Sequence, residues 1–522
     1  MASKGVMPKR GNLKTNFIFN LISQILGLII PFITSPYISR VLQVEVVGRI
    51  SYVNSIITYF VLFANLGLNI YGQRQIAKYR EDLEEKSKTF WEIITLRMVL
   101  TTISLIVFFI IYSAFGFGEK YNLFILISSL QIFAIPLNIQ FLYQGEENFK
   151  SLAIRDIFFK VISLVFLFAF IKSKEDGWIY VLISSLSSLA SALVMWPGAF
   201  SYLKKISFKS LDIKKHIKPT IMIFLPTLAV TIYSVLDKSM IGWLAPTPDY
   251  ANGCYDRAYT INSMALLLVT VINAIMIPRN ANEFAKGAME KVRENVHISF
   301  RYVLMIGLPL IAGFLVLSNS LVSWFIGPGF EDVPILLKIM SIRFVVSGFG
   351  AIMGEQLFIA IGKEKYPTIA TFIAAFVNIL LNLILIPYLG AIGAAITTAV
   401  SEVLVTSILL VLGLRGKYFS INKVLKLSYK YFIAALIMFV PIFFMNKVMS
   451  YTIWNFLIIM IVGILVYGIS LLILKDQLVY DVLKVGIGFI NKKRNKTKEE
   501  NNLLNNDTNM TIIEDKEQIN EN

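Results

Sequence analysis

Residues 91–116, WEIITLRMVLTTISLIVFFIIYSAFG, form an apolar block that holds only two charged residues, Glu92 and Arg97. A helix rises about 1.5 Å per residue, so about 20 apolar residues cross the roughly 30 Å hydrocarbon layer of a membrane. The block is therefore long enough to span a bilayer as a helix. Similar blocks recur along most of the chain.

The composition of the 522 residues also indicates a membrane protein. Hydrophobic residues make up 56% and charged residues 16%, whereas soluble proteins carry about 25% charged residues. These values exclude a soluble globular, a disordered and a collagen-like chain. The single cysteine, Cys254, excludes a disulfide framework. The two histidines, His216 and His297, lie in polar connections, which argues against a catalytic or metal-binding histidine pair.

We predict an all-α polytopic membrane protein with about fourteen transmembrane helices, two of the connections being very short, at 42–45 and at 388. Of the 49 Lys and Arg residues, 36 lie in the terminal segments and in the connections on the same side. The opposite connections hold six. Because cytoplasmic loops carry the excess of Lys and Arg, both termini are predicted to be cytoplasmic. The net charge of +16 thus follows membrane topology, and nucleic acid is not expected as a partner.

A weak internal repeat divides the chain into two halves. One predicted external turn lies between Arg40 and Arg49, and another lies between Lys238 and Arg257. Repeated six-helix halves are a transporter pattern, so we predict two pseudo-symmetric six-helix bundles with two appended helices. The predicted segments are a cytoplasmic N-terminus (1–15), an N-lobe (16–203), a basic linker (204–218), a C-lobe (219–412), a basic loop with two helices (413–474), and a cytoplasmic, largely disordered tail (475–522).

Polar side chains at helical spacing follow the first two helices of each predicted half. A polar stripe that faces lipid is unfavourable, so these stripes should face protein or water. Two interpretations stay open: the stripes line a shared central cavity, or they hold neighbouring helices together by hydrogen bonds. The candidate cavity-lining residues are Asn20, Gln24, Asn54, Asn65, Thr231, Ser234 and Thr260.

Five cations within or near the predicted helices are candidates for binding an anionic substrate. An Arg or Lys at the centre of a span costs at least ~2.5 kcal/mol, which favours a functional role. Lys238 and Arg343 have no acidic residue at helical spacing, and we expect them to be the stronger candidates. For Arg40, Arg49 and Arg257, snorkelling to the membrane interface is an equal alternative.

Motifs for enzyme catalysis are missing from the sequence. Residues 413–418, GLRGKY, come nearest to a phosphate-binding loop and fail its pattern. No Asp-x-Asp pair marks the end of a predicted span, and no Ser/His/Asp grouping can be argued. We therefore expect no enzymatic activity and no cofactor.

Six segments in order along both halves carry a family resemblance: LQVEVVGRISYVNSI (42–56), YGQRQIAKYR (71–80), YQGEENFKSLAIRD (143–156), IYSVLDKSMIG (232–242) with GCYDRAYTI (253–261), IPRNANEFAKG (277–287) and GAIGAAITTAVSE (390–402). Together they resemble the Wzx-type polysaccharide transporters, oligosaccharide flippases of the multidrug/oligosaccharidyl-lipid/polysaccharide (MOP) exporter superfamily. The resemblance implies two six-helix bundles around a central cationic cavity that opens alternately to each side. It also implies an undecaprenyl-diphosphate-linked oligosaccharide as substrate.

The expected function is that of a flippase in the bacterial plasma membrane, with membrane lipids and the lipid-linked oligosaccharide as partners. It would carry repeat units to the outer leaflet for capsule, O-antigen or exopolysaccharide assembly, with a polysaccharide polymerase as a candidate partner. The membrane potential could drive this step, or inward H⁺ or Na⁺ could, with Asp237, Glu355 or Glu402 as the coupling site. A cation-coupled multidrug exporter and a lipid II flippase stay as alternatives.

Overall fold

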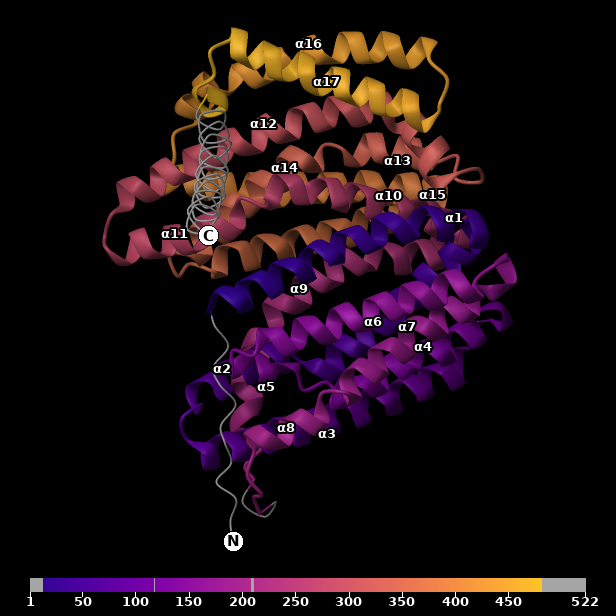
Figure 1. Ribbon diagram of the computed structural model, residues 1–522, viewed down its shortest axis with the longest axis vertical. Helices are drawn as coiled ribbons and strands as arrows, with labels where there is room; N and C mark the ends of the chain where they lie inside the picture. Colours follow the sequence, from indigo (N-terminus) through magenta and orange to yellow (C-terminus); the bar gives the residue numbers. More distant parts are fainter. Residues whose placement is uncertain (1–12, 117, 208–210, 481–522) are drawn as a thin grey trace, which may run out of the picture.

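The computed structural model describes residues 13–116, 118–207 and 211–480, apart from the side chains of some helical residues within 13–28 and 226–234 and at position 427. All regular elements in these residues are helices, which lie roughly side by side across the molecule (Figure 1). The tail that the sequence predicts to be disordered lies mostly outside the described residues. The predicted all-α fold is confirmed.

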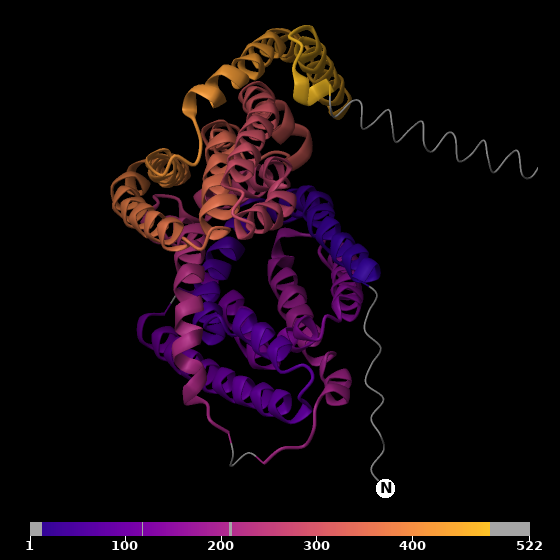
Figure 2. The same ribbon diagram turned by 90° about the vertical axis from the view of Figure 1, so that its left-hand side faces the viewer.

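The first half of the chain forms one lobe, drawn from indigo to magenta in Figures 1 and 2. Its helices are α1 (Leu13–Asn65), α2 (Leu68–Lys78), α3 (Leu83–Phe115), α4 (Glu119–Leu137), α5 (Gln140–Gly145), α6 (Phe149–Phe170), α7 (Gly177–Leu193) and the short α8 (Trp196–Ala199). Two single 3₁₀ turns, Lys174–Asp176 and Phe200–Tyr202, connect or follow them. We call this part the N-lobe.

The C-lobe begins with α9 (Lys214–Leu244), which starts inside the predicted linker. It continues with α10 (Pro248–Thr270), α11 (Asn273–Ala285), α12 (Met289–Leu321), a π-helical turn (Val322–Ile326), α13 (Val333–Met340), α14 (Arg343–Ala351) with a second π-helical segment (Ile352–Ile359), and α15 (Lys365–Arg415). The pair α16 (Ile421–Val448) and α17 (Ile453–Ile473) packs on α12 through an apolar cluster at the edge of this lobe (Figure 1).

Two very long helices are interrupted where the sequence predicts short connections. Gln43 in α1 has φ 63°, and Gly390 in α15 has φ 53° with ψ −127°, and neither is helical. The halves of α15 fold back on each other, because Asn378 in the first half bonds Thr397 in the second. Each long helix therefore behaves as a hairpin of two helices.

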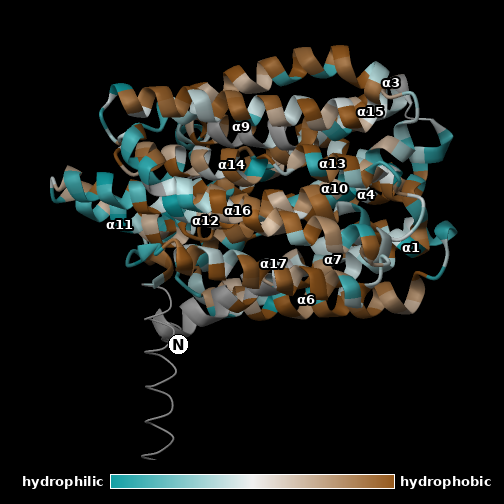
Figure 3. Cartoon of the chain, turned by 90° about the horizontal axis from the view of Figure 1, so that it is seen from above, coloured by the Kyte–Doolittle hydropathy of each residue, from teal (hydrophilic) through white to brown (hydrophobic). Residues whose placement is uncertain are grey.

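By length and apolar composition, eight helices among the described residues could cross a membrane, or up to ten if each of two bent pairs forms one span. This finding supports a polytopic membrane protein, and the figure of fourteen stays a prediction. Figure 3 shows hydrophobic colour along the middle of the bundle and hydrophilic colour gathered at its two ends, which is the pattern of helices that cross a bilayer.

Several helices begin earlier than the apolar pattern predicts. The helix that contains the block 91–116 begins at Leu83, and Asp82 caps it by accepting from the backbone N–H groups of Glu84 and Glu85. A polar helical extension lies outside the hydrocarbon layer, so it adds nothing to an apolar pattern. The boundary of a membrane helix is therefore set by its cap and not by its last apolar residue.

Candidate functional site

The two lobes meet where the bend of α1 lies against the start of α10. We call this the hairpin contact, and the end of the bundle where it lies the hairpin end, at the right of Figure 1. Two glycines allow the close approach: a Cβ on Gly48 would lie 1.7 Å from the carbonyl oxygen of Asp249, and one on Gly253 would lie 2.1 Å from that of Val44. The reciprocal arrangement agrees with the predicted repeat of the two hairpins.

Asp249 ties three groups of the N-lobe to the C-lobe at the outer edge of this contact. Its carboxylate accepts from Arg49 Nε at 3.0 Å, from Lys120 Nζ at 2.9 Å and from the Tyr121 hydroxyl at 2.5 Å. The Asp249 side chain is only 12% exposed, so solvent screens these bonds less than it would at a surface. They hold the hairpin end closed.

Asp256 forms a second layer deeper in the same contact. Its carboxylate accepts from Lys238 Nζ at 2.6 Å and lies 3.1 Å from Arg257 Nη2. Ser51 on α1 donates to it at 3.2 Å, and Arg257 reaches back to the Ser35 hydroxyl of α1 at 2.7 Å. Both halves of α1 thus contact adjacent residues of α10, which places the two halves beside each other.

Arg343 extends the cluster into the C-lobe. Its guanidinium donates to the Asn262 side chain at 3.0 Å and pairs with Glu402 at 3.4 Å. The aromatic ring of Tyr259 lies between two cations, with Arg343 5.0 Å and Lys238 5.7 Å from its centre. A ring placed in this way stabilises both positive charges without neutralising them.

Lys238 and Arg343 have no acidic residue at helical spacing, but each pairs with an acidic residue of another helix. Asp256 pairs with Lys238 across the α9–α10 hairpin, and Glu402 pairs with Arg343 from α15. Arg40 is exposed and donates to the backbone carbonyl of Trp324, and it makes no salt bridge among those found in the described residues.

The predicted cations nevertheless gather along the contact of the lobes and the adjoining part of the C-lobe, where Asp237 and Glu331 also lie, bonded to Tyr255 and Tyr250 of α10. One group of these charges consists of six cations and three carboxylates. We call it the cation cluster: Arg40, Arg49, Lys120, Lys238, Arg257 and Arg343, with Asp249, Asp256 and Glu402. Asp249 and Lys120 were not among the sequence candidates, because each lies in the first turn of a helix and pairs with the other lobe.

The predicted polar stripes separate into two groups. Ser51 and Ser55 of α1 face the C-lobe, Ser55 bonding Ser239 at 2.8 Å. Asn65, a predicted cavity residue, instead lies near the fully buried Arg97 of α3, whose Nη2 is 3.4 Å from the Asn65 amide oxygen and 2.8 Å from that of Asn69. Asn65 therefore connects helices within the N-lobe.

The cavity-lining role of the other predicted residues stays a prediction. Asn54, Thr231 and Thr260 are half-buried in the described structure. The side chains of Asn20, Gln24 and Ser234 lie outside the described part of the structure.

Of the three predicted coupling acids, Asp237 has the most enclosed environment. It is 2% exposed and accepts from Tyr255 at 2.6 Å, from Asn382 Nδ2 at 2.7 Å and from Thr398. These donors are neutral, and no salt bridge of Asp237 occurs among the described residues. By contrast, Glu355 is exposed and accepts from Asn273 at 2.9 Å, and Glu402 is neutralised by Arg343.

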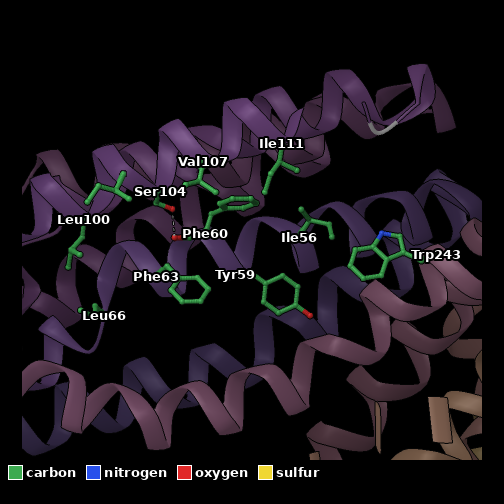
Figure 4. Close-up of a pocket in the computed structure, with 11 residues that line it drawn as sticks. Ile56, Tyr59, Phe60, Phe63, Leu66, Leu100, Ser104, Val107, Ile111 and Trp243 are labelled. Atoms are coloured by element: carbon green, nitrogen blue, oxygen red, sulfur yellow. Dashed lines mark hydrogen bonds between the residues drawn. The ribbon is translucent and has the colours of Figure 1, made fainter. Parts of the chain in front are cut away.

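One pocket among the described residues is apolar and lies outside the cation cluster. It has a volume of about 630 Å³ and lies between α1, α3 and Trp243 of α9 (Figure 4). Its lining includes Phe60 and Phe63, with Tyr59 and Ser104 among its few polar side chains. Such a surface suits hydrocarbon and offers little to a charged head group.

The fold and the cation cluster define a two-lobed helical membrane transporter. A family model described as "Polysaccharide biosynthesis protein" matches residues 13–282. The chain therefore belongs to the polysaccharide biosynthesis protein family, as the sequence resemblance predicts.

The chain is also similar to individual named proteins and to solved structures. A protein of Escherichia coli (strain K12) named for O-antigen transport is 25% identical over 410 residues, which cover 76% of this chain and 96% of the relative. Among solved structures, the lipid II flippase MurJ in an inward closed conformation has a TM-score of 0.70 at 19% identity, covering 89% of this chain and 99% of that one. A MATE-family multidrug transporter of the MOP superfamily, in its inward-facing conformation, has a TM-score of 0.62 at 16% identity, with 78% and 98% covered. These structures share the fold.

Proposed function

We propose that the protein is a flippase that moves undecaprenyl-diphosphate-linked oligosaccharides from the cytoplasmic to the outer leaflet of a bacterial plasma membrane. The main support is the cation cluster, in which Arg49, Lys238 and Arg257 lie where the two lobes meet and the last two share one carboxylate. A diphosphate carries the complementary charge and accepts charge-assisted hydrogen bonds from arginine and lysine. A drug exporter for cationic substrates would be expected to have the opposite sign of charge there.

The contacts support an alternating-access mechanism. Asp249 and Asp256 tie the lobes together at the hairpin end, and the excess of Lys and Arg in the predicted connections supports a cytoplasmic location for the opposite end. In this state the substrate would enter from the cytoplasmic leaflet. Opening the hairpin end would then release it outward.

Arrival of the substrate supplies a reason for the lobes to separate. Lys238 and Arg257 share one carboxylate, Asp256. A diphosphate that takes hydrogen bonds from these two cations competes with Asp256. Since Asp256 also holds Ser51 of the N-lobe, the competition weakens the hairpin contact. Substrate binding is thereby coupled to opening.

The relatives support the same class of substrate. One is named for O-antigen transport and the similar structure for lipid II, and both names refer to glycans or their lipid-linked precursors. For this chain we propose a role in capsule, O-antigen or exopolysaccharide assembly, with a polysaccharide polymerase as the next component. As its relatives are transporters, the protein moves its substrate and does not convert it.

Asp237 is the proposed site of ion coupling. A buried carboxylate without a cationic partner is costly, so it would be stabilised by a proton or by Na⁺. The side-chain oxygens of Tyr255, Thr398 and Asn378 lie around Asp237 and its partner Asn382 and could serve as further ligands. Without such coupling, the membrane potential could drive export: two negative charges moving outward across 100 mV gain roughly 4–5 kcal/mol.

The decisive experiment for the transport function is depletion of the protein in growing cells. Lipids are extracted and analysed by mass spectrometry, while surface polysaccharide is measured in parallel. The proposal predicts that single undecaprenyl-diphosphate-linked repeat units accumulate and that surface polymer disappears. Altered drug sensitivity without accumulation would instead support the multidrug exporter, and accumulation of lipid II would support the second alternative.

Coupling is tested separately with Asp237→Asn, which keeps the shape of the side chain and removes its charge. In cells or vesicles with an imposed H⁺ or Na⁺ gradient, wild-type transport should respond to one of the two ions, and the variant should lose that response. If transport by Asp237→Asn follows either gradient as the wild type does, Asp237 is not the coupling site.

A further inference from the structure

A second pocket, separate from the apolar one, lies in the N-lobe between α1, α6 and α7. Its volume is about 350 Å³, within the range of small-molecule sites. Eight of its lining side chains are polar or charged: Thr34, Asp156, Lys160, Ser163, Ser184, Ser187, Ser188 and Ser191, in addition to Tyr180. We call it the hydroxyl pocket. Such a concentration of hydroxyl groups inside a membrane lobe requires an explanation, because unsatisfied polar groups are costly there.

Four of its hydroxyl groups make no hydrogen bond with the described part of the protein. They come from all three helices: Thr34 on α1, Ser163 on α6, and Tyr180 and Ser187 on α7. All four residues are half-buried. Because these hydroxyls are half-buried and line one pocket, they can bond water or a ligand that enters it.

Helix-to-helix bonding does not explain these serines. Ser185, also on α7, turns toward α4 and accepts a hydrogen bond from Gln131 at 3.4 Å, as a serine that joins two helices should. The pocket serines behave differently: Ser184, Ser188 and Ser191 donate only to backbone carbonyls of their own helix. Their remaining lone pairs stay available to accept hydrogen bonds from a ligand.

The hydroxyl pocket adjoins the cation cluster. Thr34 is the neighbour of Ser35, which accepts from Arg257 at 2.7 Å. Tyr180, on the pocket wall, packs against the apolar core of the hairpin contact, which includes Tyr255 and Ala258 of α10. From Tyr180 to Ser191 the wall rises along α7 by about 16 Å. A ligand held by Arg257 at one end can therefore extend along the hydroxyls of the pocket.

We propose that the hydroxyl pocket binds the sugar residues of the substrate while the cation cluster holds its diphosphate, a proposal that rests on the proposed function. Sugars present many neutral hydroxyls that both donate and accept, which matches open Ser, Thr and Tyr hydroxyls in number and kind. The rings of Tyr180 and Phe159 supply apolar surface for the carbon face of a sugar ring. The pocket thus contributes to selection of the oligosaccharide.

The test compares two probes on the purified full-length protein by native mass spectrometry. One is the lipid-linked oligosaccharide extracted from depleted cells, and the other is undecaprenyl diphosphate without sugar. The wild type should bind the sugar-bearing lipid more tightly, by at least about tenfold for two or more additional hydrogen bonds. Ser187→Leu, which fills the pocket, should abolish this difference and leave binding of the bare lipid unchanged.

A milder variant guards against misfolding. Ser163→Ala combined with Ser187→Ala removes two hydroxyls that have no protein partner, so the fold should be retained and affinity for the sugar-bearing lipid should fall by about tenfold. For Ser187→Leu, the matched control is the same substitution at Ser113, on the exposed face of α3. Unchanged binding in both pocket variants, or an equal loss for both lipids, would overturn the proposal. A wild type that binds neither lipid would instead refute the flippase function itself.

Discussion

Replacing Gly253 with alanine should push the protein out of the state in which the hairpin end is closed. A Cβ at this position would lie 2.1 Å from the Val44 carbonyl oxygen, whereas an ordinary contact begins at 3.4 Å. The backbones of α1 and α10 would have to separate by about 1.3 Å, the difference between these two distances. Overpacking of this kind costs about 1–3 kcal/mol.

The cost falls on the closed state alone, because the two hairpins separate when the lobes open. A penalty of 1–3 kcal/mol changes the balance of two states by about 5- to 150-fold. A cross-link between Ser55→Cys and Ser239→Cys reports the closed state, since the two native hydroxyl oxygens are 2.8 Å apart on α1 and α9. Cys254→Ala provides a background without other cysteines.

We expect Gly253→Ala to lower the rate of oxidative cross-linking at least fivefold and to slow export. Gly313→Ala on α12 is the control, because a Cβ there meets no atom within 4 Å. If Gly253→Ala cross-links as fast as the control while it elutes as a folded monodisperse protein, the hairpin contact does not set the closed state, and the argument for alternating access from this contact fails.

Four further outcomes are expected. Lys238→Ala should reduce export about tenfold or more. The variant should still reach its normal abundance in the membrane, because Asp256 keeps Arg257 as a second cationic partner. Normal export in a complementation assay would contradict the role of the cation cluster in substrate binding. Glu92→Ala should lower stability by about 1–3 kcal/mol, since this fully buried carboxylate accepts four hydrogen bonds or ion pairs that fix the start of α9; an unchanged melting temperature in detergent would refute it. Truncation after Lys498 should leave export intact. Asp476→Ala should expose the loops around α16 and α17 to limited proteolysis, because Asp476 anchors these helices to α12. If the variant resists protease as well as the wild type does, Asp476 is not this anchor.

The arrangement of the polypeptide was largely predictable from the sequence, because membrane thickness and the apolar pattern determine most of it. The interruption of α1 at Gln43 and that of α15 at Gly390 fall in or close to the predicted connections. The equivalence of the hairpins followed from the cations on both sides of each external turn, and Gly48 and Gly253 prove to make reciprocal contacts. Helix starts were less predictable, because polar extensions such as the one before Trp91 leave no apolar signal.

The partners of the charged residues could not be predicted in the same way. Local rules recognise ion pairs three or four residues apart on one helix. Lys238 and Asp256 are 18 residues apart, and Arg343 and Glu402 are 59 apart. Pairs of this kind depend on where two helices cross, which one sequence does not specify. The same limit applies to Asn65, whose partner Arg97 lies on another helix.

The pairing of the predicted cations strengthens the case for anion binding. Unpaired arginines and lysines in a membrane lobe would be costly in the absence of substrate. Fully paired ones would have to give up an equal number of carboxylates before an anion could bind. Sharing Asp256 between Lys238 and Arg257 avoids both problems, because each cation keeps a hydrogen-bonding partner while the group retains a net positive charge. A transporter must also release its substrate, and here Asp256 can retake both cations once the diphosphate leaves. Affinity that is moderated by a competing carboxylate is therefore suited to a cycle of binding and release.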